Sequence, residues 1–213
     1  MPRYESSTFV PAPAAFLRLL GRPAVFLDRD GTLNEEVGHV LHTGAVRLLP
    51  DAVTGLRLLN QAGLTTVVIT NQSGVGRGLF TEATLASVVE TLLKLLGAGG
   101  AHLNALYYCP HHPDDGCACR KPLPGMLYDA AADLALALPH SYVIGDTLRD
   151  LESGWAAGCH TVLVRTGNGP ETLRNLTGSA QQPDAVCATL AEAAEWVLAH
   201  RSVHGPVAGA GAG

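Results

Sequence analysis

Short apolar runs alternate with longer amphipathic segments along most of the chain, and this alternation is the feature that most limits its fold. Six runs rich in β-branched residues predict strands at 24–28, 65–70, 105–109, 141–146, 161–165 and 184–188. The segments between them predict helices at 51–61, 81–96, 124–136, 148–157 and 190–200. Strands and helices that alternate in this way form a parallel sheet with helices on both faces. The sequence therefore predicts an α/β protein, a Rossmann-like three-layer sandwich with a central parallel sheet.

The length of 213 residues fits one domain, which we place at 23–200 because no repeat or second domain is visible. Residues 1–22 form an N-terminal extension. Its apolar stretch resembles a signal peptide only weakly, because Arg18 interrupts it and Glu5 precedes it, so we expect a short packing helix there. Residues 201–213 end in GPVAGAGAG, which cannot bury a core, and we expect a disordered tail.

The composition excludes several classes of protein. A formal net charge of −5 argues against binding to nucleic acid, which requires a basic face. No apolar stretch reaches the roughly 18–20 residues of a membrane span. We therefore expect a soluble cytoplasmic monomer whose partner is a small molecule, with no nucleic acid and no membrane. In that compartment the five cysteines should be free or bound to metal rather than paired in disulfides.

Polar side chains follow three of the predicted strands at the point where each strand ends. Asp28 closes the run VFLD, Thr70 closes VVIT and Asp146 closes YVIGD. Because the carboxyl ends of parallel strands face the ligand crevice of an open sheet, these side chains should converge at one edge. The sequence therefore predicts a functional site there.

Asp28 and Asp30 form a D-x-D pair in the segment DRDGT. Two carboxylates this close repel each other unless a cation or a proton lies between them. A hard divalent ion such as Mg²⁺ prefers oxygen ligands, and Asp146 supplies a further carboxylate. For an isolated pair, a helix cap at Asp28 and a turn residue at Asp30 would be the simpler interpretation. The pattern shared by three strand ends favours a magnesium site instead.

Four segments, in this order, resemble the motifs of the haloacid dehalogenase superfamily of phosphatases. DRDGT at 28–32 resembles the first motif, D-x-D-x-[TV] after an apolar strand, and Thr70 resembles the second. Lys121 in CRKPLPG resembles the third, and GDTLRD at 145–150 resembles the fourth. Each motif is a weak signal alone, but the ordered set is specific and covers residues 24–165.

The residue types in these motifs suit a phosphatase with a covalent intermediate. Asp28 would attack phosphorus and form an aspartyl-phosphate, and Asp30 would protonate the leaving alkoxide and then activate water. The resemblance implies that the backbone carbonyl of Asp30, rather than its carboxylate, contacts Mg²⁺. Asp146 would be a metal ligand, and Thr70, Lys121 and the metal would stabilise the phosphoryl oxygens.

Asp150 lies one helical turn after Asp146 and should face the same way. It could hold a metal-bound water or orient Lys121. It could also be only an acid at a helix N-terminus, where the helix dipole favours negative charge.

The segment CPHHPDDGCACRKP concentrates three of the five cysteines next to two histidines. Four sulfur and nitrogen ligands in so few residues match a structural Zn²⁺ site of the Cys3His type. The predicted zinc ligands are Cys109, His111, Cys117 and Cys119. His112 is the rival histidine. A disulfide is disfavoured by the compartment and a nucleophilic thiol by the carboxylates that already account for the chemistry, while Cys159 and Cys187 should be small core residues.

The zinc loop directly precedes Arg120 and Lys121, so it would act as a scaffold that holds both cations at the mouth of the crevice. The loops after Asp30 and Cys109 are too short for a cap domain, and we expect a capless, open site. Specificity would then come from the loop EEVGHV after the first motif, the loop NQSGVGRG after the second, and the zinc loop. The residues expected to bind substrate are Asn71, Gln72, Ser73, Arg77 and Arg120.

The segments CPHHP and CACRKP resemble the branch of the superfamily that contains D-glycero-D-manno-heptose 1,7-bisphosphate 7-phosphatases and histidinol-phosphatases. Ser73 stands where histidinol-phosphatases typically have Asp, which would suit a cationic amine. Arg77 and Arg120 could instead form a fork for the second phosphate of a bisphosphate. We therefore expect hydrolysis of the C7 phosphate of the heptose bisphosphate, with histidinol phosphate or another small sugar bisphosphate as the alternative. A zinc-containing binding module without turnover is disfavoured because the catalytic set is complete.

Overall fold

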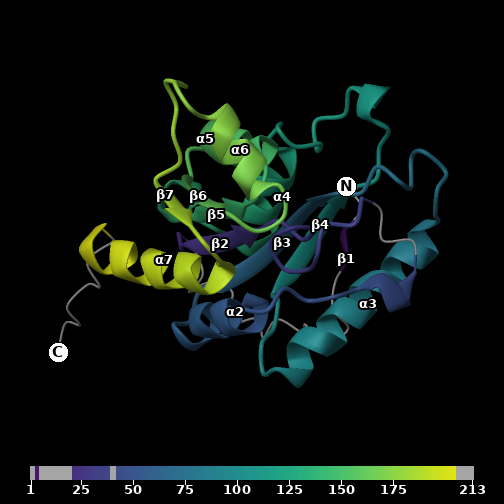
Figure 1. Cartoon of the computed structure of the whole chain (residues 1–213), viewed down its shortest axis with the longest axis horizontal. Helices are drawn as coiled ribbons and strands as arrows, with labels where there is room; N and C mark the ends of the chain where they lie inside the picture. Colours follow the sequence, from purple (N-terminus) through teal and green to yellow (C-terminus); the bar gives the residue numbers. More distant parts are fainter. Residues whose placement is uncertain (1–2, 5–20, 39–41, 205–213) are drawn as a thin grey trace.

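The computed structural model describes residues 3–4, 21–38 and 42–204 of the chain. Its strands are β1 Arg3–Tyr4, β2 Ala24–Leu27, β3 Thr65–Asn71, β4 Ala105–Cys109, β5 Tyr142–Gly145, β6 His160–Val164 and β7 Ala185–Cys187. They form one sheet in the order β1-β4-β3-β2-β5-β6-β7 (Figure 1). The six strands from β4 to β7 in this order are parallel, and β1 pairs antiparallel with β4 at the edge. The predicted α/β fold with a central parallel sheet is confirmed.

The helices are α2 Ala52–Gln61, α3 Glu82–Ala98, α4 Gly125–Leu134, α5 Leu148–Ala157, α6 Gly169–Asn175 and α7 Leu190–His204. Short 3-10 turns lie at η1 Thr43–Ala45, η2 Pro113–Asp115 and η3 Leu138–His140. Thr81 caps α3, because its side chain accepts a hydrogen bond from Thr84 N at 3.1 Å. None of these helices is both long and apolar enough to cross a membrane.

The side chains of the strands alternate between cores on the two faces of the sheet. In β2, Val25 and Leu27 join the core that packs against α2, α3 and α7, whereas Phe26 joins the core that packs against α4. A third apolar cluster packs α5 and α6 against the same face as α4. Figure 1 shows the resulting three layers, with α4, α5 and α6 above the sheet and α2, α3 and α7 below it.

Two elements of the structure were not predicted. α6 has seven residues and begins inside the segment TGNGP, where no helix was predicted. It is held in place by tertiary packing, since Thr172 and Leu176 are buried. β1 is two residues long, which is too short to show any periodicity.

The chain ends differ in part from the prediction. The packing helix expected in the N-terminal extension falls almost entirely on residues 5–20, outside the described residues. α7 continues to His204, so the first four residues of the predicted disordered tail are helical. No helix breaker occurs before Gly205, which explains the longer helix. The rest of the predicted tail, 205–213, lies outside the described residues.

Candidate active site and metal centre

The carboxyl ends of three neighbouring strands converge at one edge of the sheet, as the sequence predicts. β2 ends just before Asp28, β3 contains Thr70, and β5 ends just before Asp146. All three side chains belong to residues that are at most 8% exposed. A cleft opens at this edge, and its lining includes Asp28, Thr70 and Lys121.

Three buried carboxylates form a cluster, named here the carboxylate cluster. Oxygen atoms of Asp28, Asp146 and Asp150 all lie within 4.8 Å of one another. The ammonium group of Lys121 donates hydrogen bonds to Asp28 Oδ1 at 2.8 Å and to Asp150 Oδ1 at 2.5 Å. It also donates to the carbonyl oxygen of Ile69 at 2.8 Å. Lys121 contacts two of the three carboxylates, so ionisation of all three would leave an excess of negative charge.

Asp150 has a second task at the start of α5. Its Oδ2 accepts hydrogen bonds from Thr147 N at 3.0 Å and Thr147 Oγ1 at 2.6 Å, which completes a capping box. A Cβ atom on Gly145 would collide with the Asp150 side chain, so only glycine allows this approach. Asp150 is thus both a helix N-terminal acid and a partner of Lys121, the two alternatives that the sequence left open.

Burial and mutual repulsion determine the electrostatics of the carboxylate cluster. Desolvation raises the pKa of Asp28 well above its usual value; Lys121 opposes this shift, and the charges of Asp150 and Asp146 add to it. Desolvation, followed by the charge of Asp150, raises the pKa of Asp146 to about 7. Asp146 Oδ2 accepts hydrogen bonds from Asn168, but the buried Oδ1 has no partner among the described residues. A divalent cation would relieve both the repulsion and the unpaired oxygen.

Asp30 lies on the cleft wall but is not part of the carboxylate cluster. Its Oδ1 accepts hydrogen bonds from Arg29 Nε at 3.0 Å and Asn34 Nδ2 at 2.8 Å. Its Oδ2 accepts from Arg29 Nη2 at 2.7 Å and Gln72 Nε2 at 3.0 Å. Burial raises the pKa of Asp30, but the charge and hydrogen bonds of Arg29, with those of Asn34 and Gln72, lower it below its usual value.

The loop after β3 joins the second motif to the third. Gln72 Nε2 donates a hydrogen bond to Thr70 Oγ1 at 2.9 Å. Asn71 and the backbone of Lys121 form two hydrogen bonds, from Asn71 Nδ2 to Lys121 O at 3.0 Å and from Lys121 N to Asn71 Oδ1 at 3.1 Å. Asn71 and Gln72, which were predicted to bind substrate, therefore contact Lys121 and Thr70.

The arginines at the cleft are not the pair that the sequence suggested. Arg120 lines the cleft together with Ser73, whereas Arg77 is exposed and is not among the lining residues. Arg149 lines the cleft instead; it was not predicted to do so, although it lies within the fourth motif. Glu36 also lines the cleft; it lies in the loop EEVGHV, which was expected to contribute to specificity, although Glu36 itself was not singled out.

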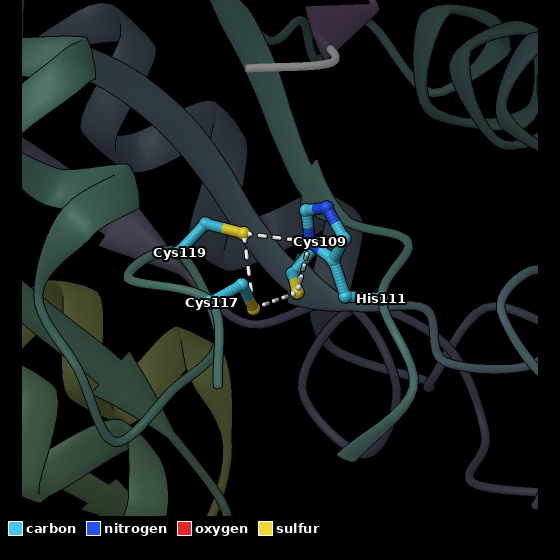
Figure 2. A group of neighbouring side chains, drawn as sticks. All are labelled: Cys109, His111, Cys117 and Cys119. Carbon is cyan, nitrogen blue, oxygen red and sulfur yellow. Dashed lines mark hydrogen bonds between the residues drawn. The ribbon is translucent and has the colours of Figure 1, made fainter. Parts of the chain in front are cut away.

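Figure 2 shows a second cluster, named here the Cys/His cluster, whose side chains point toward one another. Its members are Cys109, His111, Cys117 and Cys119, the predicted ligand set. His111 Nδ1 lies 3.6 Å from Cys109 Sγ and 3.1 Å from Cys119 Sγ. Cys117 Sγ lies 3.5 Å from Cys119 Sγ and 3.5 Å from Cys109 Sγ. Zinc bonds of about 2.3 Å to sulfur and about 2.0–2.1 Å to nitrogen place tetrahedral ligands about 3.5–3.8 Å apart. The cluster is therefore compatible with a tetrahedral metal ion.

The rival histidine lies outside the Cys/His cluster. His112 caps η2, where its side chain accepts a hydrogen bond from Asp114 N at 3.3 Å. The loop then closes through Gly116, whose φ of 62° is a conformation that favours glycine. The other two cysteines, Cys159 and Cys187, are buried in the apolar cores, as predicted.

The Cys/His cluster is attached directly to the cleft loop. Gln72 N donates a hydrogen bond to the carbonyl oxygen of Cys109 at 2.7 Å, and Gly76 N donates to Pro110 O at 2.8 Å. A Cβ atom on Gly76 would lie 2.5 Å from His112 N, so the two loops pack backbone against backbone. A metal ion in the Cys/His cluster would therefore stabilise one wall of the cleft.

Comparison with known proteins agrees with this architecture. Residues 118–193 match the HAD-hydrolase-like family model. A D-glycero-beta-D-manno-heptose-1,7-bisphosphate 7-phosphatase of Bordetella bronchiseptica is 42% identical over 175 residues, which cover 82% of this chain and 97% of that protein. A D-glycero-D-manno-heptose-1,7-bisphosphate 7-phosphatase of Thermosynechococcus vestitus is 39% identical over 190 residues, which cover 84% of this chain and 97% of that protein.

A solved structure shares the fold over nearly the same region. The crystal structure of D,D-heptose 1.7-bisphosphate phosphatase from B. bronchiseptica, complexed with magnesium and phosphate, aligns with a TM-score of 0.79 at 41% identity. The alignment covers 84% of this chain and 99% of that chain. Together with the polar strand ends, these matches define a hydrolase of phosphate esters on a parallel α/β sheet. The chain belongs to the haloacid dehalogenase-like hydrolase family, and it is a phosphatase.

Proposed function

We propose that this phosphatase removes the C7 phosphate of D-glycero-D-manno-heptose 1,7-bisphosphate in a Mg²⁺-dependent reaction that passes through an aspartyl-phosphate at Asp28. The observation that carries the proposal is the buried carboxylate cluster around Lys121 at the edge of the cleft. The choice of ester is supported by relatives of 39–42% identity that are named for this substrate.

Asp28 is the nucleophile in this proposal. Its carboxylate would attack phosphorus in line, so that a bond from Asp28 to phosphorus forms while the bond from phosphorus to the C7 oxygen breaks. The ammonium group of Lys121, 2.8 Å from Asp28 Oδ1, and the hydroxyl of Thr70 on the same cleft wall would bind the phosphoryl oxygens. Groups fixed in advance in this way stabilise the charge that develops in the transition state.

Asp30 moves the protons in both half-reactions. In the first it would donate a proton to the departing C7 oxygen. In the second it would accept a proton from the water that attacks phosphorus, which releases inorganic phosphate and restores the Asp28 carboxylate. Its position two residues after the nucleophile, on the cleft wall, supports this role.

The residues present fit Mg²⁺. Carboxylate oxygens of Asp28 and Asp146 would hold the ion together with the backbone carbonyl of Asp30, the last by the family resemblance. The unpaired Asp146 Oδ1 and the raised pKa values of Asp28 and Asp146 support this ligand set. When bound, the ion supplies positive charge to the phosphoryl group. Asp150 would keep Lys121 oriented toward the nucleophile.

Arg120 and Arg149 would bind the second phosphate of the substrate. Both line the cleft, which replaces the earlier expectation of a fork made by Arg77 and Arg120. Arg120 Nη1 has no hydrogen-bond partner among the described residues, so this donor is not engaged by the protein. Ser73 would contact the sugar with Asn71 and Gln72. Two arginines favour a bisphosphate over the cationic amine of histidinol phosphate.

Zn²⁺ is the ion that we assign to the Cys/His cluster. Three thiolates and one imidazole leave no open position for substrate, so this ion would be structural. It would close residues 109–119 into a rigid turn directly before Arg120 and Lys121, whose side chains face the cleft.

The test is phosphate release from both anomers of heptose 1,7-bisphosphate in the presence of magnesium, with NMR to identify the remaining phosphate. We expect heptose 1-phosphate as the product and no turnover by Asp28→Asn. A higher kcat/KM on histidinol phosphate or another sugar bisphosphate would replace the proposed substrate. Binding of these esters without hydrolysis by the parent protein would replace the proposed reaction by a binding function.

A further inference from the structure

Arg29 occupies the variable position between the two carboxylates of the first motif, and no step above uses it. Its side chain is only 2% exposed. Burying a guanidinium is costly unless its donors are satisfied, yet Nη1 has no hydrogen-bond partner among the described residues. The role of Arg29 is therefore inferred from the hydrogen bonds of its other two nitrogen atoms, Nε and Nη2.

These donors bind both oxygens of Asp30. Nε donates to Oδ1 at 3.0 Å and Nη2 donates to Oδ2 at 2.7 Å, which is a bidentate pair. Nη2 also donates to Gln72 Oε1 at 3.2 Å. Arg29 is not among the residues that line the cleft, whereas Asp30 and Gln72 are, so any effect of Arg29 on substrate must pass through them.

Asp30 is left with one orientation. An ionised carboxylate has about four positions for hydrogen-bond donors, and here each oxygen accepts two hydrogen bonds. Arg29 supplies two of the four, Asn34 one and Gln72 one. A planar guanidinium prevents rotation of the carboxylate, which a single ammonium contact would permit.

The backbone of Arg29 holds the same turn. Its carbonyl oxygen accepts hydrogen bonds from Leu33 N at 2.8 Å and Asn34 N at 3.1 Å. Asn34, which donates to Asp30, is therefore itself placed by Arg29. One buried residue fixes the main chain around Asp30 and the direction of its carboxylate.

We propose that Arg29 is a positioning residue: its bidentate pair keeps the Asp30 carboxylate on the cleft wall, so that the oxygen freed when the Asn34 or Gln72 hydrogen bond opens exchanges protons with the ester oxygen and with water. Gln72 links this pair to Thr70, because Gln72 Nε2 also donates to Thr70 Oγ1 at 2.9 Å. The inference rests on the proposed function, since it requires Asp30 as the acid and base of a phosphatase.

The experiment compares two leaving groups. An alkoxide needs a proton as it departs, whereas 4-nitrophenolate departs without one, so only the alkyl ester depends strongly on a well-placed acid. We expect Arg29→Met to lower kcat/KM about 100-fold on heptose 1,7-bisphosphate and less than about fivefold on 4-nitrophenyl phosphate. Arg29→Lys should recover part of the loss, because it keeps one charged donor.

A double variant tests whether Arg29 acts through Asp30. In an Asp30→Asn background, Arg29→Met should cause no further loss on 4-nitrophenyl phosphate, because the group that it positions is already gone. Additive losses would overturn the inference. Equal losses of Arg29→Met on both esters would also overturn it, because they would indicate a merely structural role.

Two further measurements keep the inference testable. If Arg29→Met shows no cooperative thermal transition, Arg29→Lys and Asn34→Ala take its place, and both should show the same dependence on leaving group with a smaller loss. If neither shows it, the inference is wrong. A parent protein that hydrolyses neither ester overturns the proposed function. If the parent hydrolyses 4-nitrophenyl phosphate but not heptose 1,7-bisphosphate, the proposed substrate is wrong, and the two leaving groups are then compared with a different sugar phosphate that the parent does hydrolyse.

Discussion

The two polar clusters of this molecule differ in how their ligands are brought together. The ligands of the Cys/His cluster all come from residues 109–119, and their side chains face one another. The carboxylate cluster combines Asp28 with Asp146 and Asp150, which are more than a hundred residues further along the chain. It shares its edge with Lys121 and opens on the cleft.

In the proposed function, this difference separates a structural centre from a reactive one. Four sulfur and nitrogen ligands close a tetrahedron and leave no position for a substrate. An incomplete set of oxygen ligands beside a lysine leaves room for a phosphoryl group. Changes in the carboxylate cluster should therefore affect turnover more than stability, and changes in the Cys/His cluster should do the reverse.

The largest expected effect is the loss of turnover in Asp28→Asn. Without a nucleophile, kcat should fall at least about 1,000-fold. The thermal midpoint of the metal-free protein should stay the same or rise. The pKa of Asp28 is higher in the folded than in the unfolded state, so ionisation of this carboxyl lowers the stability of the fold once the pH exceeds the unfolded-state pKa. Asparagine cannot ionise and avoids this loss. Phosphate release and calorimetry measure both effects, and parental turnover would refute the role of Asp28.

Brief treatment with EDTA should distinguish the two metals. The open carboxylate cluster should release its ion, while the closed Cys/His cluster retains its own. Activity should fall about 100-fold or more and return when magnesium is added. Mass spectrometry of the treated protein should still find about one zinc per chain. Recovery that requires zinc instead of magnesium would reverse the assignment of the two centres.

Lys121→Met should affect both turnover and stability, because Lys121 is the cation shared by Asp28 and Asp150. Removal of one oxyanion partner should lower kcat about 100-fold. Two buried carboxylates would lose their ion-pair partner, and the free energy of unfolding should fall by about 3–5 kcal/mol. Denaturant titration with and without magnesium checks this value. Magnesium should restore part of the lost stability, and a stability equal to that of the parent would contradict the contacts described for Lys121.

Cys117→Ser should lower stability and metal content more than it lowers turnover. The loop before Arg120 and Lys121 would lose a zinc ligand, and a small displacement of these side chains should reduce kcat about tenfold. Metal analysis should find less zinc, with a lower thermal midpoint. Cys159→Ser is the matched control, because this buried thiol lies outside the Cys/His cluster. The Cys159→Ser protein should therefore keep its full zinc content. Full zinc content in Cys117→Ser would contradict the ligand set.

The smallest expected effect is a change in KM when an arginine at the edge of the cleft is replaced. Arg149→Ala should raise the KM for the bisphosphate up to about fivefold, because an exposed ion pair contributes about 1 kcal/mol or less. Arg77→Ala should leave KM unchanged, because Arg77 is exposed and is not one of the residues that line the cleft. Steady-state kinetics on the bisphosphate compares the two variants. An equal increase in KM in the two variants would support the fork of Arg77 and Arg120 that the sequence suggested.

Local patterns predicted most of the fold. The strands and the five longer helices repeat the hydrophobic periodicity of the sequence, and α5 has the predicted bounds. α6 and β1 escaped prediction because a seven-residue helix and a two-residue strand depend on what they pack or pair with rather than on their own pattern. The Cys/His ligands were predictable because they lie within one short loop.

The sequence by itself determined the order of the elements, which strand ends carry polar groups, and the members of the Cys/His cluster, because each of these depends on neighbours along the chain. Only the tertiary structure decided that Lys121 contacts Asp28, 93 residues away, and that Arg29 reaches Gln72, 43 residues away. It also decided which arginines face the cleft. Such pairings depend on strand order and side-chain direction, and both arise only when the sheet has assembled.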